Sequence, residues 1–417
     1  MLHIVPSISP HFTPSPWSRP PAYSLQPNCA PEFYSEAARP TARRCTPTAN
    51  PTPIAHLSLP SSSPFPALPL RAMSGTMVPL SSSKLVMGRS GVSGITATIF
   101  GSAGFLGKYV VNRFGRIGTR CILPHRGDEV DVRHLKLAGD LGAIYPVQSS
   151  IRSLSDIEAA VADSNVVINL VGKHFETMRW SFTDVNHTFP GVLAQVCADV
   201  GVERLIHVSA LGATVDAPSA WSRSKALGEE AVREAFPGAT ILRPATMFGD
   251  EDKFLNRIAK LCTTLPFYPM SSDAATTKQQ PVYMDDVAKA IFECATTSAH
   301  MGKTLDLAGP KVYTNREIVD YVFDVIKEDP NDVTFSPPIA TAIAFGFQQL
   351  PNPWMTADAM RRTSVDLTMP AGSPGFEEIG MTDLVAMEDV CERYLIRFRQ
   401  MSAMVDDDNT VVNSPKL

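Results

Sequence analysis

The sequence predicts an α/β fold in which a doubly wound parallel sheet is followed by a smaller C-terminal α+β part. From residue 95 onward, short apolar runs alternate with helical patterns. The first apolar run leads directly into glycines spaced G-x-x-G-x-x-G. Alternating strand and helix units favour a parallel sheet covered on both faces, and Val166-Val-Ile-Asn-Leu-Val171 has the continuous apolar character of a strand buried in such a sheet.

The individual elements follow from these periodicities. Apolar runs of four to six residues predict strands at Thr96–Phe100, Thr119–Leu123, Ala143–Val147, Val166–Val171, Arg204–Ser209 and Thr240–Arg243. The segments between them predict helices at Phe105–Phe114, Leu154–Ala162, Phe189–Val200 and Ser222–Ala235. Beyond Gly249 we expect helices at Lys253–Thr263, Asp285–Thr296 and Asn315–Ile326, and a strand at Thr304–Leu307.

Two later features concern helix ends and surfaces. Asp285 and Asp286 are expected to cap the free N–H groups of their helix. Pro337-Pro338 is expected to break the chain. The apolar run Ile339–Phe347 is shorter than the roughly 18 residues of a membrane span, so it suits an interfacial or subunit-contacting helix, with an ordinary cap over the core as the alternative.

The composition divides the chain into regions. Residues 1–92 carry seven Lys/Arg and two acids, and 16 of the 35 prolines precede residue 70. A segment without periodicity cannot bury a core, so 1–92 is expected to be a disordered leader of the transit-peptide type, unless the true start is Met73 or Met77. We therefore predict a dinucleotide-binding domain at 93–248, a smaller region at 249–402 and a solvated acidic tail at 403–417. The seven scattered cysteines indicate no zinc site or disulfide framework and fit a reducing compartment.

The glycine motif predicts where a dinucleotide would bind. Gly101 permits the tight turn, Gly104 lets the backbone approach a pyrophosphate, and Gly107 allows close packing of the following helix. The first turn of that helix presents free N–H groups to the phosphates. A merely structural turn is the alternative. The predicted pyrophosphate-binding residues of this Rossmann domain are Gly101, Ser102, Ala103, Gly104, Phe105, Leu106 and Gly107.

Further motifs resemble the extended, or atypical, short-chain dehydrogenases/reductases. They are Asn169-Leu-Val-Gly172, His207-Val-Ser209 and Trp221-Ser-Arg-Ser-Lys225. More narrowly, Phe105-Leu-Gly-Lys-Tyr-Val-Val-Asn-Arg-Phe-Gly-Arg-Ile-Gly118 and Phe248-Gly-Asp-Glu-Asp-Lys-Phe-Leu-Asn256 resemble the nucleotide-binding accessory subunits of mitochondrial complex I, NADH:ubiquinone oxidoreductase. The resemblance covers residues 94–325 well and 350–400 more loosely.

The resemblance implies a location, partners and further cofactor-binding residues. It implies a subunit on the matrix side of the inner mitochondrial membrane that stabilises the junction of the peripheral and membrane arms. Its partners would be other complex I subunits, with inner-membrane lipid as a further contact and no nucleic acid. The additional residues that it implies for cofactor binding are Leu170, Val171, Gly172, Ser209, Lys225 and Pro244.

The catalytic slot departs from the pattern of a working reductase. Such enzymes use Tyr-x-x-x-Lys, in which the Tyr transfers a proton and the Lys holds the ribose. Here Lys225 is present, but Trp221 occupies the Tyr position. An indole N–H does not titrate in water, and losing a general acid or base forfeits about 10²–10⁴ in rate. We therefore expect no turnover and no catalytic residue; the alternatives are an NADP-dependent reductase or isomerase of quinone or isoprenoid metabolism and a sensor of the NADPH/NADP ratio.

The end of the second strand indicates which cofactor is held. Arg126 offers a bidentate fork to a 2′-phosphate and so favours NADPH, whereas Asp128 is the acid that an NAD-specific site would use. Ser150-Ile151 stands where related chains have an acid beside the adenine, which loosens that contact. The histidines His125 and His207 are interpreted as structural residues, and the acids 250–252 as a helix start and not a metal site.

Overall fold

The computed structural model describes residues 93–350, 353 and 355–399. The predictions for the leader 1–92 and the tail 403–417 lie outside the described residues. All the described residues fall within one compact unit, Gly75–Leu417.

The main feature is a seven-stranded sheet whose neighbouring strands all pair in parallel. The strands across the sheet are β11 Thr304–Leu307, β6 Thr240–Pro244, β5 Arg204–Val208, β4 Val166–Asn169, β1 Thr96–Phe100, β2 Arg120–His125 and β3 Ile144–Gln148. The order reverses between β1 and β4, where a doubly wound sheet opens its ligand crevice at the carboxyl ends of the strands. The predicted fold class is thus confirmed.

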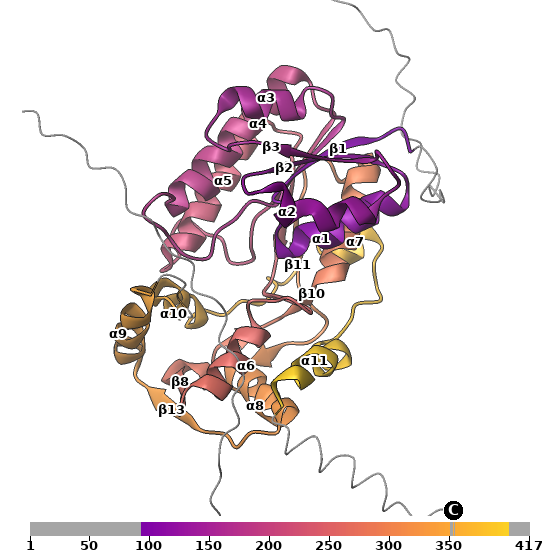
Figure 1. Ribbon diagram of the computed structural model, residues 1–417. Coiled ribbons are helices and arrows are strands. Elements are labelled where there is room, and N and C mark those ends of the chain that lie inside the picture. Colours follow the sequence, from indigo (N-terminus) through magenta and orange to yellow (C-terminus); the bar gives the residue numbers. More distant parts are fainter. Residues whose placement is uncertain (1–92, 351–352, 354, 400–417) are drawn as a thin grey trace, which may run out of the picture. The chain divides into compact units, whose positions relative to one another are not determined.

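Helices cover both faces of this sheet (Figure 1). Helices α3, α4 and α5 pack on one face around Phe100, and α1 and α7 pack on the other around Phe114. Helix α1 buries Leu106, Val110 and Phe114, spaced four residues apart, which gives it a single apolar stripe. The helices concerned are α1 Phe105–Arg116, α3 Leu154–Val161, α4 Phe189–Val200, α5 Ala220–Ala235 and α7 Met284–Thr296, and a short α2 covers Glu129–Val132.

The first turn of α7 binds a neighbouring helix. The carboxylate of Asp285 accepts hydrogen bonds from Arg113 Nε at 3.1 Å and Nη2 at 2.5 Å, which ties α7 to α1. Buried Asp286 pairs with Lys289 and accepts the Val385 amide at 3.0 Å. Neither side chain caps the helix as we expected, since no side-chain cap bond is formed at its start. Both α7 and β11 lie beyond residue 248, so the sheet draws on both predicted regions.

A second core lies among the remaining elements. Its buried residues come mainly from α6, α8, α11 and β8, with Phe248 and Val322 fully buried in it. Glu317 and Thr314 form a reciprocal capping box that fixes the start of α8. The elements are α6 Leu255–Thr264, α8 Asn315–Ile326, α10 Ala357–Thr363, α11 Met387–Leu395, and the paired strands β7 Met247–Phe248 with β10 Val282–Tyr283, β9 Lys278–Gln279 with β12 Tyr313–Thr314, and β8 Tyr268–Ser271 with β13 Asp332–Phe335.

The double proline begins a helix. We expected Pro337-Pro338 to break the chain, and this was wrong: both residues lie in the first turn of α9, Pro337–Gln348. Proline is well accommodated there, because a first-turn N–H has no partner within the helix and the fixed φ of proline is already helical. Ala340 and Ala344 are buried, while Ile339 and Phe345 are 52% and 58% exposed. Among the described residues no helix has the length and apolar character needed to cross a membrane.

Candidate functional site

The glycine loop lies at the carboxyl end of β1, and each glycine has a distinct geometry. Gly101 has a positive φ of 82°, and a Cβ there would lie 3.0 Å from the backbone carbon of Leu170. A Cβ on Gly107 would lie 2.4 Å from the carbonyl oxygen of Ser102. Gly104 precedes α1, and a Cβ there would meet only the Gly101 oxygen, at 3.1 Å. The turn and the close packing are thus as expected, and a Cβ at Gly104 would be in tight contact with the Gly101 oxygen alone.

The loop's other residues divide between the core and the surface. Ala103 is exposed, whereas Leu106 is buried in the core beneath α1. Phe105 packs edge-on against Tyr109 with ring centroids 6.1 Å apart. The hydroxyl of fully buried Ser102 finds no hydrogen-bond partner among the described residues. A buried hydroxyl without a partner is costly, so this atom is suited to a ligand or an ordered water.

The end of β4 is shaped by a buried amide. Asn169 Oδ1 accepts the Val171 amide at 3.0 Å, and its Nδ2 donates to His207 Nδ1 at 3.1 Å. Burial lowers the pKa of His207 to about 3, so the ring is neutral, and its structural role stays a prediction. The Leu170 amide donates to the Phe100 carbonyl at 3.0 Å, which sets this turn beside the glycine loop.

Lys225 lies beneath the turn that follows β4. Its Nζ donates to the Val208 carbonyl at 3.1 Å, and a Cβ on Gly172 would lie 3.5 Å from the same nitrogen. Burial lowers the pKa of Lys225 to about 8, against an opposing effect of Glu229. Ser209, at the end of β5, is buried and its hydroxyl also lacks a partner among the described residues. A ligand reaching this point would therefore meet an ammonium group and a free hydroxyl.

Pro244 lies at the end of the neighbouring strand, β6. It is buried, and its carbonyl accepts the Leu211 amide at 2.9 Å. Because this carbonyl already accepts a backbone hydrogen bond, the proline ring is the part of Pro244 that could contact a ligand. The structure places Pro244 beside β5 at the same carboxyl edge of the sheet.

Trp221 occupies the position of the catalytic Tyr and is committed to structural contacts. Its Nε1 donates to the Lys173 carbonyl at 2.6 Å, and the Arg362 guanidinium carbon lies 4.3 Å from the ring centroid. Asp358 accepts from Ser219 Oγ at 2.7 Å and from the Ala220 amide at 2.8 Å, which fixes α10 on the start of α5. The contacts of Asp358 and Arg362 with the start of α5 could not be predicted from the sequence, because no local motif links these residues to positions more than 130 residues away.

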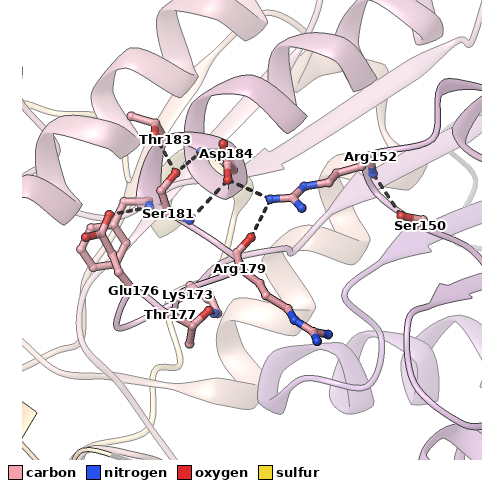
Figure 2. Close-up of polar contacts among 10 residues, drawn as sticks. Ser150, Arg152, Lys173, Glu176, Thr177, Arg179, Ser181, Thr183 and Asp184 are labelled. Atoms are coloured by element: carbon pink, nitrogen blue, oxygen red, sulfur yellow. Dashed lines mark hydrogen bonds and ion pairs between the residues drawn. The ribbon is translucent and has the colours of Figure 1, made fainter. Parts of the chain in front are cut away.

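A basic hollow of about 810 Å³ is lined by residues that follow β2 and β3 in the chain. The Trp180 ring lies 4.1 Å from the Arg152 guanidinium carbon and 5.4 Å from that of Arg126. Arg152 also donates to the Arg179 carbonyl at 2.6 Å and to Asp184 at 3.1 Å (Figure 2). The lining residues are Arg126, Ser150, Arg152, Lys173, Thr177, Met178, Arg179 and Trp180. Of these four cations, only Arg126 was predicted from the sequence.

Three further residues near the ends of β2 and β3 bear on this site: Ser150, Asp128 and His125. Ser150 lines the hollow, and its amide donates to Asp156 at 3.0 Å. Asp128 directly precedes α2 and is exposed. His125 is buried at the end of β2, with Nδ1 3.4 Å from the Leu123 carbonyl. The basic side chains therefore outnumber the acids that an NAD-specific site would need.

Of the acids at 250–252, Asp252 bonds elements of the second core and Glu251 pairs with α1. Asp252 accepts the amide of Asn256 at 2.9 Å and the hydroxyl of Tyr394 at 3.0 Å, and burial raises its pKa. Glu251 pairs with Lys108 at 2.5 Å. Among the described residues no group of three His, Cys, Asp or Glu side chains could hold a metal ion.

A 3-2-1-4-5-6 parallel sheet with this glycine loop and a buried Lys225 defines a Rossmann protein of the short-chain dehydrogenase/reductase type. The model of the 3-beta hydroxysteroid dehydrogenase/isomerase family matches residues 98–314. Two solved structures share the fold at low identity. Citrobacter triphenylmethane reductase complexed with NADP(H) has TM-score 0.56 and 15% identity, covering 72% of this chain and 99% of that one. A Streptomyces venezuelae dTDP-glucose 4,6-dehydratase with NAD bound has TM-score 0.55 and 17% identity, covering 73% and 96%.

The sequence relatives are more specific. The chain is 41% identical to NADH dehydrogenase [ubiquinone] 1 alpha subcomplex subunit 9 of Mus musculus, over 70% of this chain and 78% of that protein. It is 46% identical to the Arabidopsis thaliana subunit of the same name over 62% of this chain, a match that spans 64% of the plant protein's own length, less than two thirds. The Neurospora crassa NADH-ubiquinone oxidoreductase 40 kDa subunit is 36% identical, with 70% and 77% covered. This protein belongs to the family of these alpha subcomplex subunits 9, and the resemblance drawn from the sequence is confirmed.

We predict that the protein binds NADPH about tenfold or more tightly than NADH, and that Arg126→Ala removes this margin. A charge-assisted hydrogen bond to the 2′-phosphate contributes about 1.5–3 kcal/mol. Calorimetric titration of both cofactors measures the ratio. The matched control is Arg116→Ala, an exposed arginine at the far end of α1. Equal affinities in the wild type, or an unchanged preference in Arg126→Ala, would contradict the assignment.

The lowered pKa of Lys225 predicts a pH dependence of cofactor binding. Below about pH 8 the ammonium is charged in the free protein, and donating hydrogen bonds to a bound ribose would raise its lowered pKa, because such bonds favour the charged form. Above pH 8 the protein must take up a proton when it binds the cofactor, so its affinity should fall by up to about tenfold per pH unit. Below pH 7 Lys225 should contribute no pH dependence to the affinity. Neighbouring His207 stays neutral throughout this range. Calorimetry at several pH values tests this; Lys225→Met should give a flat profile, and a flat wild-type profile would be contrary to the expectation.

Proposed function

We propose that this protein is a non-catalytic accessory subunit of mitochondrial complex I that holds NADP(H) tightly. One observation carries the proposal: the dinucleotide cradle is intact, while the residue in the proton-donor slot is an indole whose N–H is bound to the Lys173 carbonyl at 2.6 Å. A protein with this combination can retain a cofactor but lacks the group that would accompany hydride transfer with a proton.

The residues fit NADP(H) at three points. The exposed Gly104, which has no side chain, and the start of α1 suit a pyrophosphate. Lys225 and the unpartnered hydroxyl of Ser209 suit a ribose. Arg126, beside the basic hollow, suits a 2′-phosphate. When bound, the nicotinamide would supply hydride-transfer chemistry, and the side chains of this protein supply binding and orientation. The solved neighbours with NADP(H) and NAD bound support a dinucleotide in this crevice.

The relatives support the place of action. Their names describe mitochondrial subunits of NADH dehydrogenase, so we propose other complex I subunits as partners and the matrix side of the inner membrane as the location. The protein would stabilise the junction between the peripheral and membrane arms. The exposed apolar side chains Ile339 and Phe345 on α9 offer a surface for a neighbouring subunit or for lipid.

Removing the protein from cells tests its role in assembly. Native gel electrophoresis of detergent-solubilised organelles should show the protein migrating with complex I, and cells that lack it should lose the assembled complex. Expression of the wild-type chain should restore assembly. Normal complex I in the absence of the protein, or migration of the protein alone, would instead favour a free-standing NADP-dependent reductase.

A further inference from the structure

We propose that Trp221 is a positioning residue for the adenosine end of the cofactor, because its indole N–H holds the segment 173–184 that walls the basic hollow. We call this segment the adenosine wall. The proposal rests on the proposed NADP(H)-holding function and assigns Trp221 a part in it. The observation that supports it is the hydrogen bond from Trp221, in the position of the catalytic Tyr, to Lys173, the first residue of the adenosine wall.

Trp221 is itself firmly held. Asp358 accepts from the amides of Ala220 and Trp221 and thereby fixes the start of α5, on which Trp221 lies. Arg362 covers the face of the indole with its guanidinium carbon 4.3 Å from the ring centroid. The indole therefore has a defined orientation, and its single N–H donor points at one acceptor, the Lys173 carbonyl.

Lys173 connects this contact to the hollow. Its backbone carbonyl binds Trp221, while its side chain lines the hollow and donates to Thr177 Oγ1 at 2.7 Å. Burial and the nearby charge of Arg126 lower the pKa of Lys173, which places the two cations close enough to repel each other. The charge of Glu176 opposes this lowering, and the two cations Lys173 and Arg126, which line the same hollow, suit a doubly charged anion such as a 2′-phosphate.

The rest of the wall is internally bonded, so a change at one end affects the whole. Thr177 and Trp180 exchange two backbone hydrogen bonds of 3.0 Å each. Glu176 accepts the Phe182 amide at 2.9 Å. From outside the wall, Arg152 binds the Arg179 carbonyl and Asp184, as Figure 2 shows. Trp221 supports the beginning of the wall and Arg152 its end.

The position of the wall decides how well its side chains meet the adenosine group. Lys173, Arg179 and Trp180 line the hollow, and Trp221 does not. If the Trp221 N–H is lost, the Lys173 carbonyl loses its partner and the wall shifts or loosens. Binding of the adenosine portion should then weaken, although no residue that contacts it has been changed.

Trp221→Phe tests this with adenosine 2′,5′-bisphosphate as the probe. This fragment ends at its 5′-phosphate and lacks the nicotinamide ribose that Lys225 would hold. The variant keeps an aromatic ring for Arg362 and removes the N–H donor, and its ring is smaller than the indole, which is why a control for general destabilisation is needed. Loss of one hydrogen bond of ordinary net strength should raise the dissociation constant of the bisphosphate about threefold to tenfold, and calorimetry measures this change.

Thr240→Val is the matched control. It removes a buried donor, Thr240 Oγ1, that binds the His300 carbonyl at 2.9 Å at the start of β6. It should lower the melting temperature about as much as Trp221→Phe does, and it should leave the affinity for the bisphosphate unchanged. Should Trp221→Phe fail to fold, Arg362→Ala is the second variant, since it removes the support on the other face of the indole and should weaken the bisphosphate in the same direction.

The outcomes separate the two proposals. If the wild type binds the bisphosphate and Trp221→Phe binds it equally well, the positioning role is overturned and the proposed function stands. If Trp221→Phe and Thr240→Val weaken binding equally, the effect is general destabilisation and the positioning role is again overturned. If the wild type binds neither the bisphosphate nor NADPH, the proposed function itself falls, and the inference with it.

Discussion

Gly104→Asp is expected to abolish the rise in melting temperature that NADPH gives the wild-type protein. At about 100 times its dissociation constant a ligand adds about 2.7 kcal/mol to the free energy of unfolding, which is a rise of several degrees. Gly104 has φ −75° and ψ 172°, a conformation open to any residue, and a Cβ there meets only the Gly101 oxygen at 3.1 Å. The free variant should therefore fold, and its carboxylate should repel the pyrophosphate while it caps α1.

The controls separate charge from shape. Gly104→Asn has almost the same size and also caps a helix, but it is uncharged, so it should keep part of the NADPH effect. Gly107→Ala should instead destabilise the free protein, because its Cβ would lie 2.4 Å from the Ser102 carbonyl oxygen. Thermal melts with and without NADPH report both effects. A full NADPH-dependent rise in Gly104→Asp would show that the glycine loop is not the site.

Elements with strong local signals could be predicted to the residue. Strands β1 and β11 and helices α4 and α8 have the bounds expected from the sequence, because each is a clean apolar run or a periodic segment with clear ends. Two-residue strands such as β9 and β12 could not be predicted, since two residues show no period. The prediction for the double proline was wrong for a related reason. Proline is disfavoured inside a helix and favoured at its start, and the sequence alone does not say which of the two applies at Pro337.

The candidate site divides in the same way. The geometry of Gly101 and Gly107 followed from a local motif, whereas their binding of a cofactor stays a prediction. Arg152 and Trp180 could not be found, because their stacking depends on two segments that meet only in the folded sheet. Arg362 was missed for the same reason: no pattern in the chain connects it to Trp221.

NADPH absorbance is expected to stay constant when the protein is offered quinones or carbonyl compounds. Trp221 stands in the proton-donor slot, and its N–H is bound to the Lys173 carbonyl at 2.6 Å. The indole does not titrate in water, and absence of a general acid costs about 10²–10⁴ in rate. Arg362 also covers the face of the indole, so a carbonyl substrate approaching that face would have to displace its guanidinium.

Trp221→Tyr should recover at most a trace of turnover. The new hydroxyl would lie four residues from Lys225 on the same helix face, which restores the pair that moves a proton. It would still face the Arg362 guanidinium and the backbone of Lys173, which contact the side chain at this position, so a substrate carbonyl would compete with them. Arg362→Ala combined with Trp221→Tyr is the informative control, since it removes the cover and leaves the proton donor. Steady turnover by the wild-type protein would contradict the non-catalytic role, whereas turnover confined to the double variant would show that Trp221 and Arg362 together keep the crevice inert.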